Sequence, residues 1–251
     1  MTNNNEFRVG GFNILPLVVK NLLIINGLFF LATLAFDKIN LVDLTDLLGL
    51  HFITASKFHL YQFVTYMFMH GSFSHIFFNM FALWMFGSAI ENHWGAKRFL
   101  LYYFVTGIGA GIIQEISWAI ELRDVLQLQG EMINLIGEGL IPQAELLNRF
   151  VTVGASGAVY GLLLAFGMMF PNAMIYIYFL FPMKAKWFVV LYGVIELFSG
   201  IVGSSSGIAH FAHLGGMIFG FFLILYWKNN AKRKAQQRAQ QMQQYYFHQN
   251  Y

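Results

Sequence analysis

The chain has 251 residues, of which 57% are hydrophobic, 18% aromatic and only 11% charged, and its formal net charge is +3. A typical soluble domain carries roughly 25% charged and 45–50% apolar residues, so this composition argues against a soluble protein and indicates a polytopic membrane protein. The chain contains no cysteine, which excludes disulfides, thiolate catalysis and cysteine-ligated metal sites.

Charge-free stretches predict six membrane-spanning helices, so the expected fold class is an all-α membrane protein. The first span is longer than the apolar region of a signal peptide and is followed by Asp37-Lys38 without a small-residue cleavage pattern, so we expect it to be retained. In chain order, the expected spans are residues 17–36, 63–90, 99–120, 154–170, 187–202 and 207–227.

The spans divide the chain into an N-terminal segment, a six-span domain and a basic, glutamine-rich tail, at residues 1–16, 17–227 and 228–251. Two long loops, residues 37–62 and 122–153, lie on the same side, and the second has a helix-like pattern at residues 131–150. Pro171 and Pro182 flank an aromatic run that we interpret as a bent interfacial connection. A short seventh span is the alternative there.

Basic residues are distributed unevenly between the two sides of the expected bundle. Eleven of the 15 lie on the side of the N-terminus, and the other four are Lys38, Lys57, Arg123 and Arg149. Because cytoplasmic loops are enriched in lysine and arginine, this pattern predicts that both termini are cytoplasmic and that the two long loops face outward.

Several polar side chains share one depth at the outer ends of three expected spans, as the rise of 1.5 Å per residue indicates. Polar groups inside a membrane are costly and usually face the bundle interior or a water-filled cavity, so we expect these side chains to form a site. They are Ser156 at the start of the fourth span, His70, His75 and Asn79 in the outer half of the second, and His210 and His213 near the outer end of the sixth.

These residue types suit acyl transfer. A serine hydroxyl needs a base to become a nucleophile, and histidine is the commonest base, so Ser156 is expected to pair with His213 or His210. His75 and Asn79 are four residues apart and therefore share a helix face. From that face they could donate hydrogen bonds to a developing oxyanion, together with the Ser156 amide.

Close helix packing is an alternative explanation of the serine segment. Gly154, Gly157 and Gly161 are what the close approach of membrane helices requires, and Ser156 could belong to the same packing. An intramembrane histidine can likewise bond a neighbouring carbonyl. A wholly structural explanation is less favoured, because three spans contribute serine, histidine and histidine-plus-asparagine at one depth.

The sequence lacks the motifs of several other hydrolase classes. The G-x-S-x-G of soluble hydrolases would need glycine where the chain has Ala158, there is no H-E-x-x-H, and all four aspartates lie in outer loops. A metal site built from the four histidines of the spans stays open, although no carboxylate accompanies them. Glu196, alone in the fifth span, could mark a transported ion or be hydrogen-bonded or protonated inside the bundle.

The motifs at these positions combine into a family pattern. Residues 154–157 are Gly-Ala-Ser-Gly, residues 212–220 are Ala-His-Leu-Gly-Gly-Met-Ile-Phe-Gly, and residues 91–95 are Glu-Asn-His-Trp-Gly. The second span has the spacing H-x4-H-x3-N, with its first histidine at position 70. Over roughly residues 58–227, the chain thereby resembles the rhomboid family of intramembrane serine proteases, in which G-x-S-G surrounds the nucleophile and A-H-x-x-G-x-x-x-G the base.

The resemblance implies a serine–histidine dyad without a third acid, and neither a metal nor a cofactor. The family's Trp-Arg pair in the first outer loop is absent here, and Tyr61-Gln62 occupies the comparable place. The implied site consists of the dyad Ser156 and His213, the oxyanion-hole donors His75, Asn79 and the Ser156 amide, the ring-stacking Tyr160, and the supporting glycines Gly154 and Gly157.

The resemblance also implies an activity, that of an intramembrane serine endopeptidase in the cell (inner) membrane of a bacterium. Its substrates would be single-span transmembrane proteins, cut near the outer membrane face at a small residue beside a helix-destabilising stretch. They would enter sideways past the fifth span, while water would enter from outside; no nucleic acid is expected as a partner. The competing hypothesis is a non-enzymatic membrane binder or transporter that uses the same polar cluster.

Overall fold

The computed structural model describes residues 12–40, 42–128, 132–135, 137–177, 180–202 and 209–249. Parts of several sequence-based predictions lie outside these described residues. They are residues 1–11 of the N-terminal segment, residues 131 and 136 of the helix-like pattern, residues 178–179 of the aromatic run, residues 207–208 of the last span and residues 250–251 of the tail.

Long apolar helices dominate the described part of the chain. Five segments there are long and apolar enough to cross a membrane: α1 (Leu17–Lys38), the continuous segment of α4 (Phe73–Ala82), η2 (Leu83–Gly87) and α5 (Ser88–Trp94), α6 (Ala96–Glu121), α10 (Ala185–Val202) and α11 (His210–Gln249). The apolar helix α9 (Ser156–Met169) has 14 residues and rises only about 21 Å, against a hydrocarbon core of about 30 Å. The all-α bundle is confirmed, whereas the count of six spans stays a prediction.

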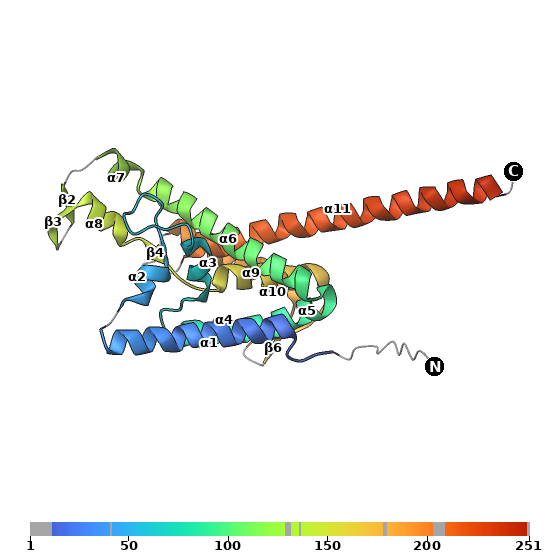
Figure 1. Ribbon diagram of the computed structural model, residues 1–251, viewed down its shortest axis with the longest axis horizontal. Helices are drawn as coiled ribbons and strands as arrows, with labels where there is room; N and C mark the ends of the chain where they lie inside the picture. The colour runs from blue at the N-terminus through green and yellow to red at the C-terminus, as the bar shows by residue number, and fades with distance from the viewer. Residues whose placement is uncertain are drawn as a thin grey trace, which may run out of the picture.

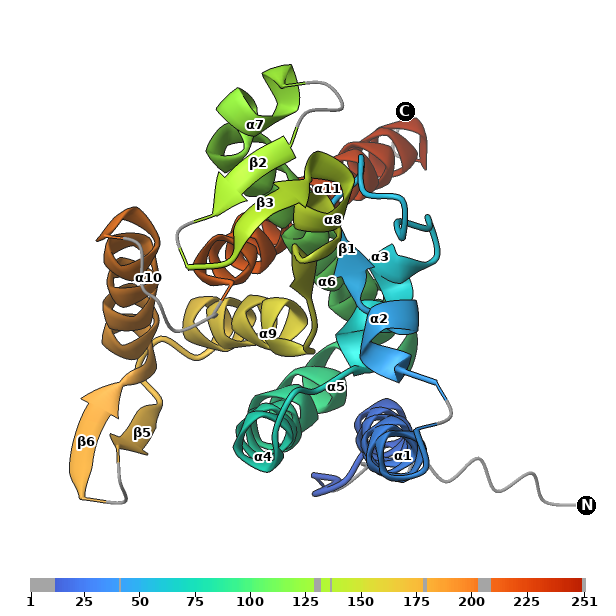
Figure 2. The same cartoon turned by 90° about the vertical axis from the view of Figure 1, so that its left-hand side faces the viewer.

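The short helix α9 lies at the centre of the bundle, in contact with α6, α10, α11 and the α4–α5 segment (Figure 2). Small residues make this position possible. A Cβ atom on Gly161 would lie 2.7 Å from the Thr106 side chain of α6, and a Cβ atom on Gly216 of α11 would overlap the Gly157 carbonyl. Such close approach is typical of packed membrane helices, and it holds the start of α11 beside the start of α9.

The two long loops gather at one end of the bundle, opposite the end where α1 begins and α11 finishes (Figure 1). Their elements are α2 (Leu44–Leu48), β1 (Leu50–His51), α7 (Arg123–Gln127), α8 (Gln143–Asn148) and β4 (Val151–Thr152). Strand β1 pairs antiparallel with β4. This pairing joins the two loops shortly before α9 begins.

Gln62 anchors the first long loop, at the place where the family's Trp-Arg pair is missing. Its side chain is fully buried, and its Oε1 accepts hydrogen bonds from the amides of His51 (3.3 Å) and His59 (3.0 Å). Its Nε2 donates to the carbonyls of Leu47 (3.3 Å) and Lys57 (3.0 Å). One side chain therefore bonds four backbone groups of this loop.

The second span begins later than the sequence predicted. Residues 63–68 belong to the short helix α3 (Gln62–Thr65) and the 3-10 turn η1 (Tyr66–Phe68), and the continuous helix starts only at Phe73. Ser72 caps that helix, because its hydroxyl accepts a hydrogen bond of 3.2 Å from the His75 amide. The prediction was wrong here because a short buried helix is as apolar as a membrane span.

Two β-hairpins occupy segments for which the sequence predicted other structures. The helix predicted from the pattern at residues 131–150 is wrong except at α8. The residues before α8 contain β2 (Met132–Leu135) and β3 (Gly139–Pro142), which pair antiparallel. Strands β5 (Met174–Ile177) and β6 (Phe181–Lys184) form the second hairpin, which excludes the alternative seventh span. Paired strands satisfy each other's backbone groups, which residue spacing along one segment does not reveal.

The expected last span and the expected tail form one helix. Helix α11 has 40 residues and continues past Trp227, where the span was predicted to end. Residues 231–246 are exposed, and this part of α11 projects away from the bundle (Figure 1).

Candidate active site

Ser156 is the first residue of α9 and follows a backbone turn that fixes its position. Gly154 has a φ of 133°, a conformation that glycine adopts far more readily than other residues. The Gly154 amide donates a hydrogen bond of 2.9 Å to the Tyr66 carbonyl. Because Thr152 pairs with Leu50 of β1, the chain that enters α9 is held on both sides.

His213 lies in the first turn of α11, next to Ser156. Its Nε2 atom is 2.8 Å from the Ser156 Oγ, within the range in which a base can accept the hydroxyl proton. The His213 side chain is largely buried. The structure therefore brings these two predicted site residues together, although they are 57 positions apart in the chain.

Tyr160 stacks on the His213 ring. The ring centroids are 4.3 Å apart and the planes are inclined by 7°. Tyr160 follows Ser156 by one helical turn, so both side chains lie on the face of α9 that contacts the start of α11. The stacked tyrosine restricts how the imidazole ring can tilt.

Glu196 of α10 joins this group, and the sequence did not identify its partners. Its Oε2 atom is 2.6 Å from the Nδ1 of His210 and 3.0 Å from the Nδ1 of His213. The Tyr160 hydroxyl donates a hydrogen bond to its Oε1. The available signal was that Glu196 is the only acidic residue in the fifth expected span, and such residues usually face a bundle interior.

His75 and Asn79 both belong to α4, and His75 borders the site. The space that a Cβ atom on Gly154 would fill lies 2.8 Å from the His75 Nε2 and 3.4 Å from the Ser156 Oγ, so both atoms border the same small volume. Asn79 is 6% exposed, and its Nδ2 has no hydrogen-bond partner among the described residues. An unpaired buried amide on the same helix as His75 is available as a donor.

The remaining two histidines of the predicted site lie at its border. His70 precedes α4 instead of lying within the second span, which corrects the prediction. Its ring is inclined by 67° to that of His75, with the centroids 5.0 Å apart. His210 contacts Glu196 and not Ser156, so the structure pairs the serine with His213 and not with His210.

A metal site built from all four histidines does not match this arrangement. The histidines form two pairs, His70 with His75 and His210 with His213. Ligand atoms of Glu196, His210 and His213 do lie within 4.8 Å of one another, a donor set that suits a divalent cation. Hydrogen bonds already account for that set, because the carboxylate has partners on both oxygens and His213 has Ser156.

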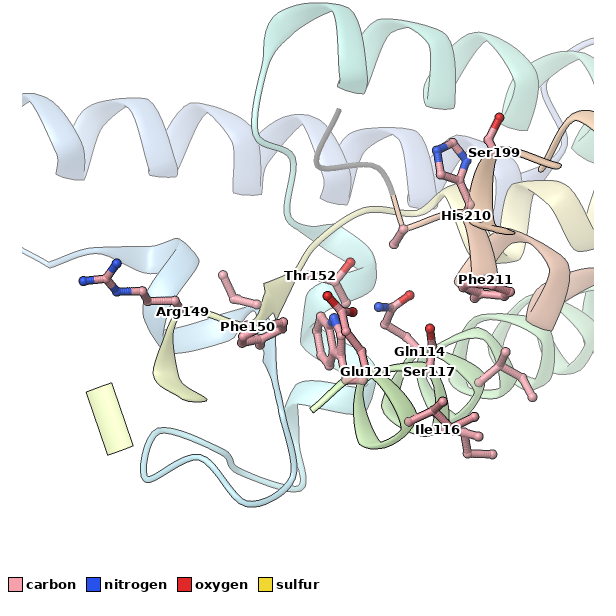
Figure 3. A pocket seen from close by; sticks show the side chains of 16 residues that line it. Gln114, Ile116, Ser117, Glu121, Arg149, Phe150, Thr152, Ser199, His210 and Phe211 are labelled. Atoms are coloured by element: carbon pink, nitrogen blue, oxygen red, sulfur yellow. The ribbon is translucent and has the colours of Figure 1, made fainter. Parts of the chain in front are cut away.

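A hollow of about 600 Å³ opens beside the site, between the ends of α6, α10 and α11 and strand β4. Its lining includes polar side chains such as Gln114, Ser117 and Thr152, and His210 lies at one border (Figure 3). Because His210 also contacts Glu196, the hollow reaches the polar cluster from the loop side.

Comparison with known proteins identifies the family. The model of the Rhomboid domain matches residues 57–229. The chain is 30% identical over 165 residues to the putative rhomboid protease YdcA of Bacillus subtilis, covering 65% of each chain. It is 27% identical to the rhomboid protease GluP of the same organism, covering 61% of this chain and 23% of the relative.

A mitochondrial relative is equally similar. Rhomboid protein 1 of Saccharomyces cerevisiae is 29% identical over 154 residues, which cover 61% of this chain and 38% of the relative. The chain spans less than two thirds of the length of the curated relatives it matches. The Rhomboid domain nevertheless accounts for more than half of this chain, and the chain therefore belongs to the rhomboid family of integral membrane proteins.

Proposed function

We propose that the chain is an intramembrane serine endopeptidase that cleaves transmembrane-anchored proteins. The observation that carries this proposal is the 2.8 Å distance between the Ser156 Oγ and the His213 Nε2, beside a small volume bordered by His75. Family membership and relatives named rhomboid proteases support it.

In the proposed reaction, His213 accepts the hydroxyl proton while Ser156 attacks a carbonyl carbon placed in the volume beside Gly154. The oxyanion then receives hydrogen bonds from the Asn79 side chain, the Ser156 amide and the His75 ring. The His75 nitrogen that borders this volume is Nε2, so this step requires the tautomer with its proton on Nε2. His213 returns the proton to the leaving amine, and water then hydrolyses the acyl-enzyme.

Substrate and water would reach the site from different directions. Helix α10 stands at the edge of the bundle (Figure 2), and its side chains Trp187, Val194 and Phe198 are all 58% exposed or more, as suits a lipid-facing helix. A single-span substrate helix would enter past it. Water would arrive through the hollow bordered by His210.

The orientation in the membrane is part of the proposal. Both termini are assigned to the cytoplasm by the distribution of basic residues, which puts the cut near the outer face. A bacterial cell membrane stays a prediction from the sequence, because the relatives include mitochondrial and chloroplastic proteins. The role of the basic end of α11 as a cytoplasmic tail also stays a prediction.

Labelling with a fluorophosphonate separates a protease from a non-enzymatic binder or transporter. We expect the full chain to be labelled, and labelling to disappear in Ser156→Ala and His213→Ala. The matched controls are Ser56→Ala, in an exposed loop, and His93→Ala, exposed near the end of α5; both should label like the wild type. If folded wild-type protein neither labels nor cleaves a transmembrane substrate, the protease proposal is wrong.

A further inference from the structure

Glu196 is buried in a helix that is otherwise mostly exposed. Its exposed fraction is 5%, while its neighbours Ile195 and Leu197 are 46% and 48% exposed. The other two buried residues of α10, Ala185 and Val189, lie in its first five positions. In the second half of α10, the buried side chain is therefore a carboxylate. Burying a carboxylate is costly unless it is well paired.

The partners of Glu196 come from the two helices that carry the proposed nucleophile and base. Tyr160 belongs to α9, and its hydroxyl donates a hydrogen bond to the Oε1. His210 and His213 belong to α11, and the Nδ1 of each lies close to the Oε2. The carboxylate thus joins α9, α10 and α11 at one point. It lies on the side of the His213 ring opposite the Ser156 Oγ, because Nε2 faces the serine.

We propose that Glu196 is a positioning residue for His213, so that the site works as a serine–histidine–glutamate triad instead of the dyad that the family resemblance implies. This inference rests on the proposed protease function. The His213 Nδ1 lies 3.0 Å from the carboxylate but makes no aligned hydrogen bond among the described residues, so the carboxylate acts through its charge. A negative charge at this distance favours the tautomer with its proton on Nδ1, which leaves the Nε2 lone pair free to accept the serine proton.

The charge of Glu196 acts during proton transfer. As the Ser156 O–H bond breaks, its proton moves to the His213 Nε2 and the oxygen forms a bond to the substrate carbonyl carbon. The ring becomes a cation, and Glu196 stabilises it while remaining ionised throughout. The hydrogen bond from Tyr160 to the same carboxylate couples the stacked ring to this arrangement.

His210 offers the alternative explanation. Its Nδ1 is closer to the Oε2 than that of His213, so Glu196 could serve only to hold the start of α11 through His210. A structural role of that kind would lower stability without a specific effect on the chemical step. The two explanations therefore differ in what a neutral replacement does to turnover.

The experiment compares Glu196→Gln, Glu196→Asp and Glu196→Ala in the full chain, reconstituted in proteoliposomes. We expect Glu196→Gln to lower the fluorophosphonate labelling rate and kcat at least about tenfold, with KM within about twofold; soluble triads lose up to about 10⁴-fold when the acid is neutralised. Glu196→Asp should retain more activity than Glu196→Gln, and added formate should partly restore Glu196→Ala.

Val189→Ala is the matched control, because it weakens the other buried contact of α10 without touching the carboxylate. It should lower the Tm and leave the labelling rate within about twofold of wild type. The triad is refuted if Glu196→Gln labels at the wild-type rate, if Val189→Ala loses as much activity, or if formate has no effect on folded Glu196→Ala. Failure of the protease proposal is distinguishable, because the wild type would then not label at all.

Discussion

Replacing Gly154 by alanine tests the volume in which the proposed mechanism places the substrate carbonyl. The new Cβ would lie 2.8 Å from the His75 Nε2, 2.9 Å from the His75 Cε1 and 3.4 Å from the Ser156 Oγ. Reacting atoms must approach to about 3–3.5 Å. The methyl group therefore occupies the place where the carbonyl carbon would react, and it also presses on one of the proposed oxyanion donors.

The backbone adds a second effect. A non-glycine residue at the φ of 133° found at Gly154 costs about 1–3 kcal/mol. If that strain disturbed only the reactive geometry, turnover would fall roughly 5- to 150-fold, at 1.36 kcal/mol for each factor of ten. Steric exclusion acts in addition, so we expect kcat/KM and the labelling rate to fall more than about 100-fold, together with a lower Tm.

Fluorophosphonate labelling, cleavage of a transmembrane substrate and thermal unfolding are measured on the same preparations. Gly71→Ala is the matched control, because a Cβ atom there meets nothing within 4 Å, and it should behave like the wild type. If folded Gly154→Ala labels and cleaves at rates within about threefold of the wild type, the carbonyl does not occupy this volume, and the assignment of His75 as a donor loses its basis.

Two further substitutions address the oxyanion hole and the loop. Asn79→Ala should lower turnover about 10²- to 10³-fold, as loss of one oxyanion donor does in a soluble protease. Its Tm should stay unchanged, because the Asn79 Nδ2 bonds nothing among the described residues. Turnover at the wild-type rate would remove Asn79 from the proposed mechanism. Gln62→Ala should lower the Tm, because each unpaired buried backbone group costs about 1–3 kcal/mol. The control Tyr61→Phe removes one exposed hydrogen bond and should change the Tm little. Equal Tm values for the two variants would refute the anchoring role.

Sequence reasoning predicted the candidate site where polar residues interrupt apolar spans. Ser156 and His213 stand out because a hydroxyl and an imidazole at one membrane depth are costly unless they have a use or a partner. Glu196 was equally conspicuous, but its partners depend on how α10 is rotated about its axis and how closely it approaches α11. Those quantities are set by packing between helices and not by spacing along one of them.

The errors in the fold have a common physical origin. Residues 63–68 were assigned to a span because hydrophobicity does not distinguish a membrane helix from a short helix buried under a loop. Hairpins β2–β3 and β5–β6 escaped detection because each strand has only four residues. Gln62 was missed because its four bonds join backbone groups from separate parts of one irregular loop, which no periodic pattern encodes.

Three helices begin at the candidate site: α4 near His75, α9 at Ser156 and α11 at His210. Each helix N-terminus carries about half a positive charge from its aligned peptide dipoles. In the proposed reaction, their combined field favours the negative oxyanion, but the same field opposes the positive charge that His213 would acquire on taking the serine proton. The negative charge of Glu196 beside that ring would offset this penalty, so the proposed mechanism has a stabilising group for each charge of its transition state.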